Sequence, residues 1–429
     1  MSWFQNHDIF FENHFIPQTA FVCTIFPTLV KNNFQKLIKH SIYILLIALA
    51  TGNSIYAQQE KLLVGADQTD QYLPLISHGK VGVVANHSSI IGKTHLVDSL
   101  LTLKIKVKKI FCPEHGFRGD GDAGEFIRNY ADKKTGLPVI SLYGSHKKPT
   151  AKDLKGIDVM IFDMQDVGVR CYTYISTMHY VMEACAEQGI TLIILDRPNP
   201  NGFYVDGPVL DTAYRSFVGL HPVPLVHGMT IGEYAQMING EKWLRNGIQC
   251  SIKVIPCKNY SHDMIYTLPV RPSPNLPNQT AVLLYPSIGF FEGTCISIGR
   301  GTDFPFQIFG HPSLPDIGFS FTPVEKVGAS KNPPYKNEKC YGYDLREYSV
   351  KYFKDNPRIN LEWLIFAYKM FKDKDKFFNS YFVNLSGTPK LKKQIEQGFD
   401  AEMIEESWKK PLDSFKTIRK KYLLYPDFE

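Results

Sequence analysis

The feature that most constrains the fold is a regular alternation of short apolar, β-branched runs with amphipathic patterns between residues 80 and 257. The expected strands cover 80–86, 107–113, 137–144, the start of 157–168, 190–200 and 250–257. The expected helices cover 95–103, 176–188 and 229–244. Continuously apolar strands that alternate with helices are typical of a mostly parallel sheet covered on both faces. The sequence therefore predicts an α/β domain.

The pattern changes beyond about residue 270. Residues 271–306 are rich in Pro and Gly, a Pro-rich stretch follows residue 311, and helical spacing returns in segments such as 361–371. A chain of 429 residues is long enough for two or three packed domains. We expect a first domain over 58–310 and a smaller α+β domain over 311–429.

The N-terminal region has the pattern of a secretory signal peptide. Lys31, Lys36 and Lys39 precede the apolar run IYILLIALA (42–50), and small and polar residues lead to Ala57. Nine apolar residues are too few to span a bilayer, which takes about 20. We expect cleavage after Ala57 and an exported protein, periplasmic or extracellular, with no transmembrane span. The aromatic-rich residues 1–30 are interpreted as an extension from a start codon placed too early.

Charge and cysteine content exclude several classes of protein. The formal net charge of +6 is small for this length, and no Arg-rich tract suggests a nucleic-acid partner. Of eight cysteines, Cys23 precedes the signal region, and the other seven lack CxxC or CxxxC spacing. The sequence therefore predicts neither a disulfide framework nor a structural zinc site.

Polar motifs follow four of the expected strands. They are NHSS, which begins at Asn86, PEHG (113–116), DMQD (163–166) and DRPNP (196–200). Open α/β sheets bind ligands in the crevice beyond the carboxyl ends of their strands. We therefore expect the functional site at this edge of the sheet.

The stretch CPEHGFRGDGDAGE (112–125) admits three interpretations. As a GxGxxG nucleotide motif it begins too far from the strand, and two aspartates lie where phosphate would bind. As a calcium loop it lacks oxygen ligands at the fifth and twelfth positions. As a carboxylate pair, Glu114 and Glu125 suit acid–base hydrolysis of a glycosidic bond. Alternatively, the glutamates only hold the loop through ion pairs with Arg118 or Arg128.

Further candidates for substrate binding come from several segments. Tyrosine and glutamine suit sugar faces and hydroxyls, although the tyrosines can equally pack in the core, and His227 is either a base or a helix-entry residue. A cleft arginine can bind a carboxylate bidentately. Asn275 in PSPN has the pattern of a turn residue. The candidates are Asn86, His115, Arg118, Asp163, Gln165, Asp166, Arg170, Tyr174, His227, Glu292 and Arg300.

Metal ligands are conceivable, because His115, Asp163, Asp166 and His227 are all of suitable type. None of them has HExxH or a similar helical spacing, and no GxSxG motif marks a serine hydrolase. We therefore expect neither a metal nor another cofactor.

The motifs together resemble a known family. VGVVANHSS, FCPEHGFRGDGDAGE, DVMIFDMQDVGVRCYTYISTM, LDRPNPNG, HGMTIGE, PSPNLP and YPSIGFFEGTCISIGRGTDFPF occur in the order found in the NamZ-type exo-β-N-acetylmuramidases. The resemblance covers the chain from residue 80 to its end. It implies a Rossmann-like domain joined to a C-terminal auxiliary domain, with an acidic cleft between them as the active site. Cys112 and Cys295 depart from the residues usual at their positions.

The resemblance implies an exo-acting glycosidase that releases N-acetylmuramic acid (MurNAc) from the non-reducing ends of peptidoglycan fragments such as MurNAc–GlcNAc. Glu114 matches the position expected to be catalytic. We expect Glu114 to be the general acid, with a pKa raised by burial or by nearby carboxylates, and Glu125 or an aspartate of DMQD to be its partner. Tyr174, His227 and Arg300 would position the sugar and its lactyl carboxylate.

Two alternatives from other classes stay open. The protein could bind peptidoglycan-derived muropeptides without cleaving them, or it could be a metal-dependent hydrolase of phosphate esters or amides. The sequence does not indicate an oligomeric state.

Overall fold

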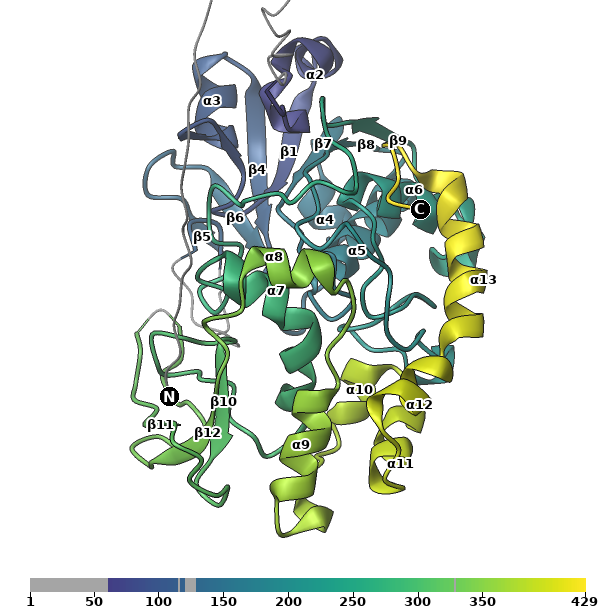
Figure 1. The fold of residues 1–429 in the computed structure, drawn as a ribbon. Helices are drawn as coiled ribbons and strands as arrows, with labels where there is room; N and C mark the ends of the chain where they lie inside the picture. Colours follow the sequence, from purple (N-terminus) through teal and green to yellow (C-terminus); the bar gives the residue numbers. More distant parts are fainter. Residues whose placement is uncertain (1–60, 115, 120–128, 328) are drawn as a thin grey trace, which may run out of the picture. The chain divides into compact units, whose positions relative to one another are not determined.

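The computed structural model describes residues 61–114, 116–119, 129–327 and 329–429, and Figure 1 shows their helices and strands. The expected signal peptide and the extension before it lie outside these residues. Within the described ranges, no helix combines the length and apolar character that crossing a membrane requires. The seven cysteines in this part of the chain are all free thiols, and six of them are buried.

The centre of the fold is a seven-stranded sheet with the order β5-β6-β4-β1-β7-β8-β9. Every neighbouring pair from β6 to β9 is parallel, and only β5 runs antiparallel, at the edge. The prediction of a mostly parallel sheet is therefore confirmed. The strands are β1 (Lys80–Ala85), β4 (Lys106–Cys112), β5 (Tyr130–Ala131), β6 (Pro138–Ser141), β7 (Val159–Asp163), β8 (Thr191–Leu195) and β9 (Ile252–Ile255).

Two apolar layers cover the sheet, as the continuously apolar strands require. Alternate residues of β1 face opposite layers, because Val83 packs in a cluster with helices α2 and α3 whereas Val84 packs with α5 and α6. The covering helices are α2 (Thr69–Ile76), α3 (Leu96–Thr102), α4 (Ala151–Leu154), α5 (Tyr174–Gln188) and α6 (Ile231–Gly240). Each strand and helix expected between residues 80 and 257 is present.

Local signals explain where two of these helices begin and end. Thr230 caps α6 through a capping box, in which its hydroxyl accepts from the Glu233 N–H and the Glu233 carboxylate accepts from the Thr230 N–H. Gly189 ends α5 in the left-handed conformation, with φ of 65°, which glycine adopts without strain. Both ends were indicated by the sequence.

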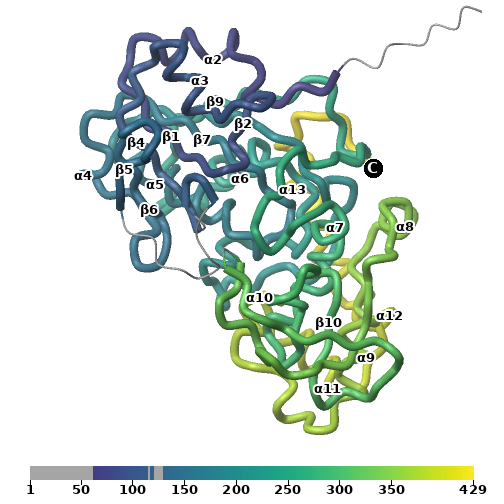
Figure 2. Tube along the Cα trace, turned by 90° about the vertical axis from the view of Figure 1, so that its left-hand side faces the viewer, coloured from purple at the N-terminus to yellow at the C-terminus, as the bar shows by residue number. Residues whose placement is uncertain are grey.

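The later part of the chain has a small antiparallel sheet and mostly helices (Figures 1 and 2). The sheet has the order β10-β12-β11. Its strands are β10 (Ile308–His311), β11 (Ser320–Phe321) and β12 (Cys340–Asp344), and a separate two-stranded ribbon pairs β2 (Ile90–Ile91) with β3 (Thr94–His95). The helices are α7 (Gln279–Ile288), α8 (Val350–Asp355), α9 (Glu362–Met370), α10 (Phe382–Ser386), α11 (Lys390–Glu396), α12 (Ala401–Glu406) and α13 (Lys409–Arg419).

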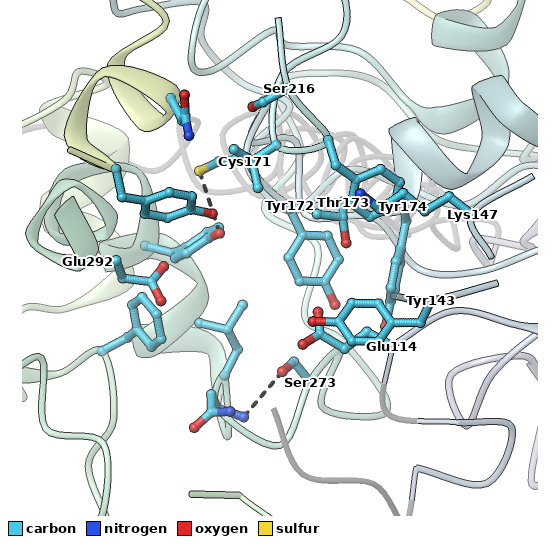
Figure 3. A pocket seen from close by; sticks show the side chains of 18 of the residues that line it. Glu114, Tyr143, Lys147, Cys171, Tyr172, Thr173, Tyr174, Ser216, Ser273 and Glu292 are labelled. Carbon is cyan, nitrogen blue, oxygen red and sulfur yellow. Dashed lines mark hydrogen bonds between the residues drawn. The ribbon is translucent and has the colours of Figure 1, made fainter. Parts of the chain in front are cut away.

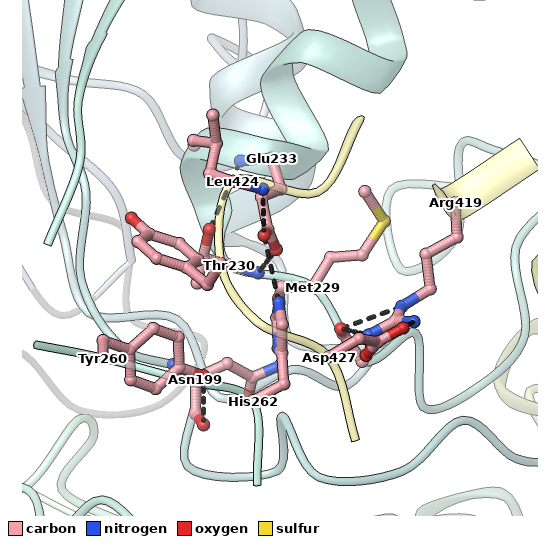
Figure 4. A network of polar contacts seen from close by, with 12 residues as sticks. Asn199, Met229, Thr230, Glu233, Tyr260, His262, Arg419, Leu424 and Asp427 are labelled. Atoms are coloured by element: carbon pink, nitrogen blue, oxygen red, sulfur yellow. Dashed lines mark hydrogen bonds and ion pairs between the residues drawn. The ribbon is translucent and has the colours of Figure 1, made fainter. Parts of the chain in front are cut away.

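The end of the chain returns to the central sheet after α13 (Figure 1). The buried Arg419 guanidinium donates to the carbonyl of Gly228, just before α6, and forms an ion pair with Asp427 at 2.7 Å (Figure 4). The Leu424 N–H and the His262 ring both contact the Glu233 carboxylate. The last residues thus fasten the C-terminal helices to the region where α6 begins.

Candidate active site

A cavity of about 550 Å³ lies beyond the carboxyl ends of β4 and β6, and both parts of the chain line it (Figure 3). From the sheet domain come Glu114, the loop after β6 with Tyr143 and Lys147, and the start of α5. From the later part come α7, the short 3-10 helix η4 (Gly289–Gly293) and α10. This volume falls in the range of small-molecule sites, about 300–1,000 Å³.

Glu114 lies two residues after the end of β4 and is partly buried on one side of the cavity. The Tyr143 hydroxyl hydrogen-bonds its carboxylate, and burial together with the Glu114 charge raises the pKa of Tyr143. The Glu114 side chain is therefore held in place by a neutral phenol. A carboxyl group that faces a cavity and has a fixed orientation meets the geometric requirement for a general acid.

Tyr172 and Tyr174 form a stiff aromatic wall beside Glu114. Their rings meet edge to face with centroids 4.6 Å apart. The Tyr172 hydroxyl donates to the Pro272 carbonyl at 2.7 Å, and the Asn86 amide donates to the Tyr174 hydroxyl at 2.7 Å. Asn86 is fully buried and does not line the cavity, so its role is to position Tyr174.

Glu292 and Arg300 lie together on another wall of the cavity, as their segment suggested. The Arg300 Nη2 donates to the Glu292 carboxylate at 2.6 Å, and its guanidinium lies 5.1 Å from the centroid of the Phe306 ring. Figure 3 shows Glu292 across the cavity from Glu114. Of the acidic residues that the structure describes, these two line the cavity.

The DMQD residues do not reach the cavity, contrary to expectation. The buried Asp163 carboxylate accepts two hydrogen bonds from Arg197, at 2.6 and 3.0 Å. The buried Gln165 amide donates to the carbonyls of Asp166 and Pro198, both at 2.8 Å. Asp166 accepts from the Gly168 N–H at 2.7 Å, and burial raises the pKa of its carboxyl to about 7.

Three basic candidates also lie away from the cavity. Arg118 forms ion pairs with Asp132 at 2.9 Å and Asp98 at 3.3 Å. The fully buried Arg170 donates to three backbone carbonyls, and burial lowers its pKa to about 10. His227 is fully buried near the start of α6, and burial lowers its pKa to about 3. Arg118 and Arg170 fasten loops, and His227 is a helix-entry residue rather than a base in the cavity.

Two of the sequence candidates, His115 and Glu125, lie outside the described residues. The assignment of Glu125 as a catalytic partner therefore stays a prediction. Among the residues that are described, no group of three or more His, Cys, Asp and Glu side chains is arranged to hold a metal ion.

Several cavity residues were not among the candidates that the sequence indicated. Tyr143 and Lys147 follow β6 in the same way that PEHG follows β4, so their place at a strand end could have identified them. Asn275, interpreted as a turn residue, also lines the cavity. Phe217, Tyr381 and Asn384 belong to segments without any recognisable motif.

Two carboxyl groups that face one cavity are the arrangement that hydrolysis of a glycosidic bond requires. Comparison with known proteins identifies the class. Residues 81–280 match the family model described as exo-beta-N-acetylmuramidase NamZ, N-terminal, and residues 283–425 match the corresponding C-terminal model. The chain belongs to the NamZ family of exo-β-N-acetylmuramidases, which confirms the resemblance seen in the motifs.

Individual relatives agree with this assignment. The chain is 38% identical over 390 residues to the peptidoglycan beta-N-acetylmuramidase NamZ of Bacillus subtilis (strain 168), covering 86% of this chain and 92% of that protein. Crystal structures of two DUF1343 family proteins from Bacteroides fragilis NCTC 9343 are also similar. One superimposes with a TM-score of 0.80 at 46% identity, over 86% of this chain and 100% of the other. The second gives 0.73 at 29% identity, over 85% and 99%.

Proposed function

We propose that this chain is an exo-β-N-acetylmuramidase in which Glu114 is the general acid. It hydrolyses the glycosidic bond that joins a terminal, non-reducing MurNAc to the rest of a peptidoglycan fragment, for example in MurNAc–GlcNAc. The family and the Bacillus subtilis relative support the reaction. The observation that carries the role of Glu114 is its place in the cavity, where Tyr143 fixes its carboxylate.

The second carboxylate of the reaction is Glu292 in this proposal. Glycosidases of this kind need one carboxylic acid to protonate the leaving oxygen and one carboxylate to assist water or stabilise the oxocarbenium ion. The Asp163 carboxylate forms a buried ion pair with Arg197, and Asp166 does not line the cavity. Among the described residues this leaves Glu292, whose ion pair with Arg300 at 2.6 Å fixes the orientation of its carboxylate.

Export belongs to the same proposal. The basic residues before the apolar run 42–50 and the small residues up to Ala57 support a cleaved signal peptide and a periplasmic or extracellular enzyme. N-terminal sequencing of the secreted or periplasmic protein tests this, and we expect the mature chain to begin near Gln58. A mature protein that retains residues 42–50 would contradict it.

The reaction and the role of Glu114 are tested with a chromogenic β-MurNAc glycoside and the matching β-GlcNAc glycoside. We expect the purified protein to release the chromophore from the MurNAc compound. In Glu114→Gln, kcat should fall by about 10²–10⁴-fold with an unchanged Tm, because a general acid contributes that much. Full activity in this variant would refute the assignment.

Two controls separate the alternatives. Measurable binding of MurNAc–GlcNAc without any cleavage would favour a binding protein. Activity lost to a chelator and restored by zinc or manganese would favour a metal-dependent hydrolase, whereas the carboxylate mechanism predicts no effect of the chelator.

A further inference from the structure

Lys147 is a cation that the sequence analysis did not consider. It lies in the loop after β6 that also carries Tyr143, and it lines the cavity. Its Nζ lies 4.6 Å from the centroid of the Phe217 ring, another cavity residue. The neighbouring Lys148 points elsewhere and pairs with Glu183 at 2.6 Å and Glu187 at 2.7 Å. Two adjacent lysines thus differ completely in their surroundings.

The charge of Lys147 is not matched by any acidic partner in the described part of the chain, where its Nζ takes part in no ion pair or hydrogen bond. Arg300, the other cation that lines the cavity, is neutralised by Glu292 at 2.6 Å. Among the described residues, Lys147 therefore supplies the uncompensated positive charge of the cavity. Glu114 also lines the cavity, so this charge favours a negative group of the ligand locally, beside Lys147.

The walls around Lys147 suit a sugar that carries an anion. Phe217 stacks on Tyr180 with centroids 6.2 Å apart and an angle of 17°, which fixes the orientation of the ring beneath the ammonium group. Thr173 and Tyr174, at the start of the 15-residue helix α5, line the same side of the cavity (Figure 3). The positive end of the helix dipole adds to the potential of Lys147.

We propose that Lys147 determines specificity by binding the lactyl carboxylate of MurNAc, an inference that rests on the proposed function. The lactyl carboxylate is the group that distinguishes MurNAc from uncharged GlcNAc. The sequence indicated Tyr174, His227 and Arg300 for positioning the sugar and this carboxylate. The geometry instead assigns Arg300 to holding Glu292, because a hydrogen bond and an ion pair already join these two side chains.

The test compares two chromogenic substrates of the same shape, the β-MurNAc glycoside and its lactyl carboxamide, which lacks the charge. Both are assayed with the wild-type protein, Lys147→Met, Lys147→Arg and Arg300→Met. Lys147→Met keeps an apolar side chain against Phe217 and removes the ammonium group. A hydrogen bond to a charged group contributes about 1.5–3 kcal/mol, which corresponds to about 10–100-fold in kcat/KM.

We expect kcat/KM of Lys147→Met for the carboxylate substrate to fall by this factor, about 10–100-fold, mainly through a higher KM. Its kcat/KM for the carboxamide should equal that of the wild-type protein. Lys147→Arg should retain most of the preference. Arg300→Met is the matched control, and it should slow both substrates alike because it disturbs Glu292. An equal effect of Lys147→Met on both substrates, or none, would overturn the proposal, as would loss of the preference in Arg300→Met alone.

A binding measurement keeps this test separate from the test of the reaction. Calorimetric titration with free MurNAc and with free GlcNAc needs no turnover. We expect MurNAc to bind more tightly to the wild-type protein, and the difference to disappear in Lys147→Met. If the wild-type protein cleaves neither substrate, the proposed function fails, and the titration still decides whether Lys147 recognises the carboxylate. Equal affinities of the wild-type protein for both sugars would contradict this role.

Discussion

Two carboxylates lie at the carboxyl ends of β4 and β7, the strands on either side of β1, yet only one of them faces the cavity. Glu114 comes two residues after the end of β4 and lines the cavity, with its carboxylate fixed by Tyr143. Asp163 is the last residue of β7, and its carboxylate is fully buried against Arg197. Both positions satisfy the rule that ligands bind beyond the carboxyl ends of parallel strands.

The difference lies in what surrounds each carboxylate. Both oxygens of Asp163 accept hydrogen bonds from one guanidinium, which also donates to the Ile90 carbonyl. These contacts join β7, the segment after β8 and the ribbon of β2 and β3 in one buried network. The Glu114 carboxylate instead accepts a hydrogen bond from the Tyr143 hydroxyl and faces the cavity. Both carboxylates are placed at this edge of the sheet by the end of a strand. The neighbouring side chains determine whether the carboxylate stabilises the fold, as in Asp163, or is open to a substrate, as in Glu114.

The largest effect that tests this comparison concerns stability. Asp163→Asn leaves the Arg197 charge buried without a partner, which costs about 3–5 kcal/mol. We expect urea denaturation to show this loss, while kcat/KM per folded molecule stays close to that of the wild-type protein. Asp98→Asn is the control, because its ion pairs with Arg118 and Lys134 are partly exposed and should contribute no more than about 1 kcal/mol each. A large fall in kcat with intact stability would place Asp163 in the chemistry after all.

The next effect concerns the cavity wall opposite Glu114. Glu292→Gln keeps the size of the side chain and removes the charge that we assign to assisting water or stabilising the oxocarbenium ion. We expect kcat to fall by about 10²-fold or more, because acid–base groups contribute that range. The melting temperature should change little, since Glu292 is about a quarter exposed, with side-chain accessibility of 24%. An activity within a few-fold of the wild-type value would exclude Glu292 and return the role to Glu125.

Glu114 and Asp163 also differ in how well their surroundings could be predicted from the sequence. The strands and helices between residues 80 and 257 could be predicted, because apolar periodicity and caps such as Thr230 and Gly189 are local signals. Glu114 could be identified as a site residue because it follows a predicted strand, which is also a local feature of the sequence. The burial of Asp163 away from the cavity could not be predicted. It depends on the ion pair with Arg197, which lies 34 residues away in the sequence and contacts Asp163 only in the folded protein.

The opposite walls of the cavity were harder to predict for a related reason. Phe217 and Tyr381 lie in segments with no motif, and they reach the cavity through contacts between distant parts of the chain. One such contact is the Arg170 guanidinium, which donates to the Leu385 carbonyl in α10 across 215 residues. Periodicity and spacing carry no information on such packing, so residues of this kind become visible only in the structure.

The smallest effect concerns the pH dependence of stability, and it separates buried acids from the catalytic ones. Burial raises the pKa of Asp166 to about 7 from an ordinary value of 3.8. At this carboxyl group the folded protein therefore binds more protons than the unfolded chain between about pH 4 and pH 7. The stability that Asp166 contributes is present below its unfolded pKa and is lost as the pH rises through its folded pKa.

His227 acts in the opposite direction. Burial lowers its pKa to about 3 from 6.5, so the stability it contributes is lost as the pH falls from about 6.5. Asp166→Asn removes the first of these contributions, and it also changes the neighbour of the His227 ring, whose Nε2 lies 3.9 Å from Asp166 Oδ2. The Tm of this variant should decline less between pH 5 and pH 8 than that of the wild-type protein, by the equivalent of about 1 kcal/mol or more. Its decline on the acid side should persist, because other groups with lowered pKa values, such as His179 and Asp132, are unchanged. A variant whose Tm follows the wild-type curve across both ranges would mean that Asp166 is ionised in the folded core, and that its neighbours compensate a charge there as Arg197 does for Asp163.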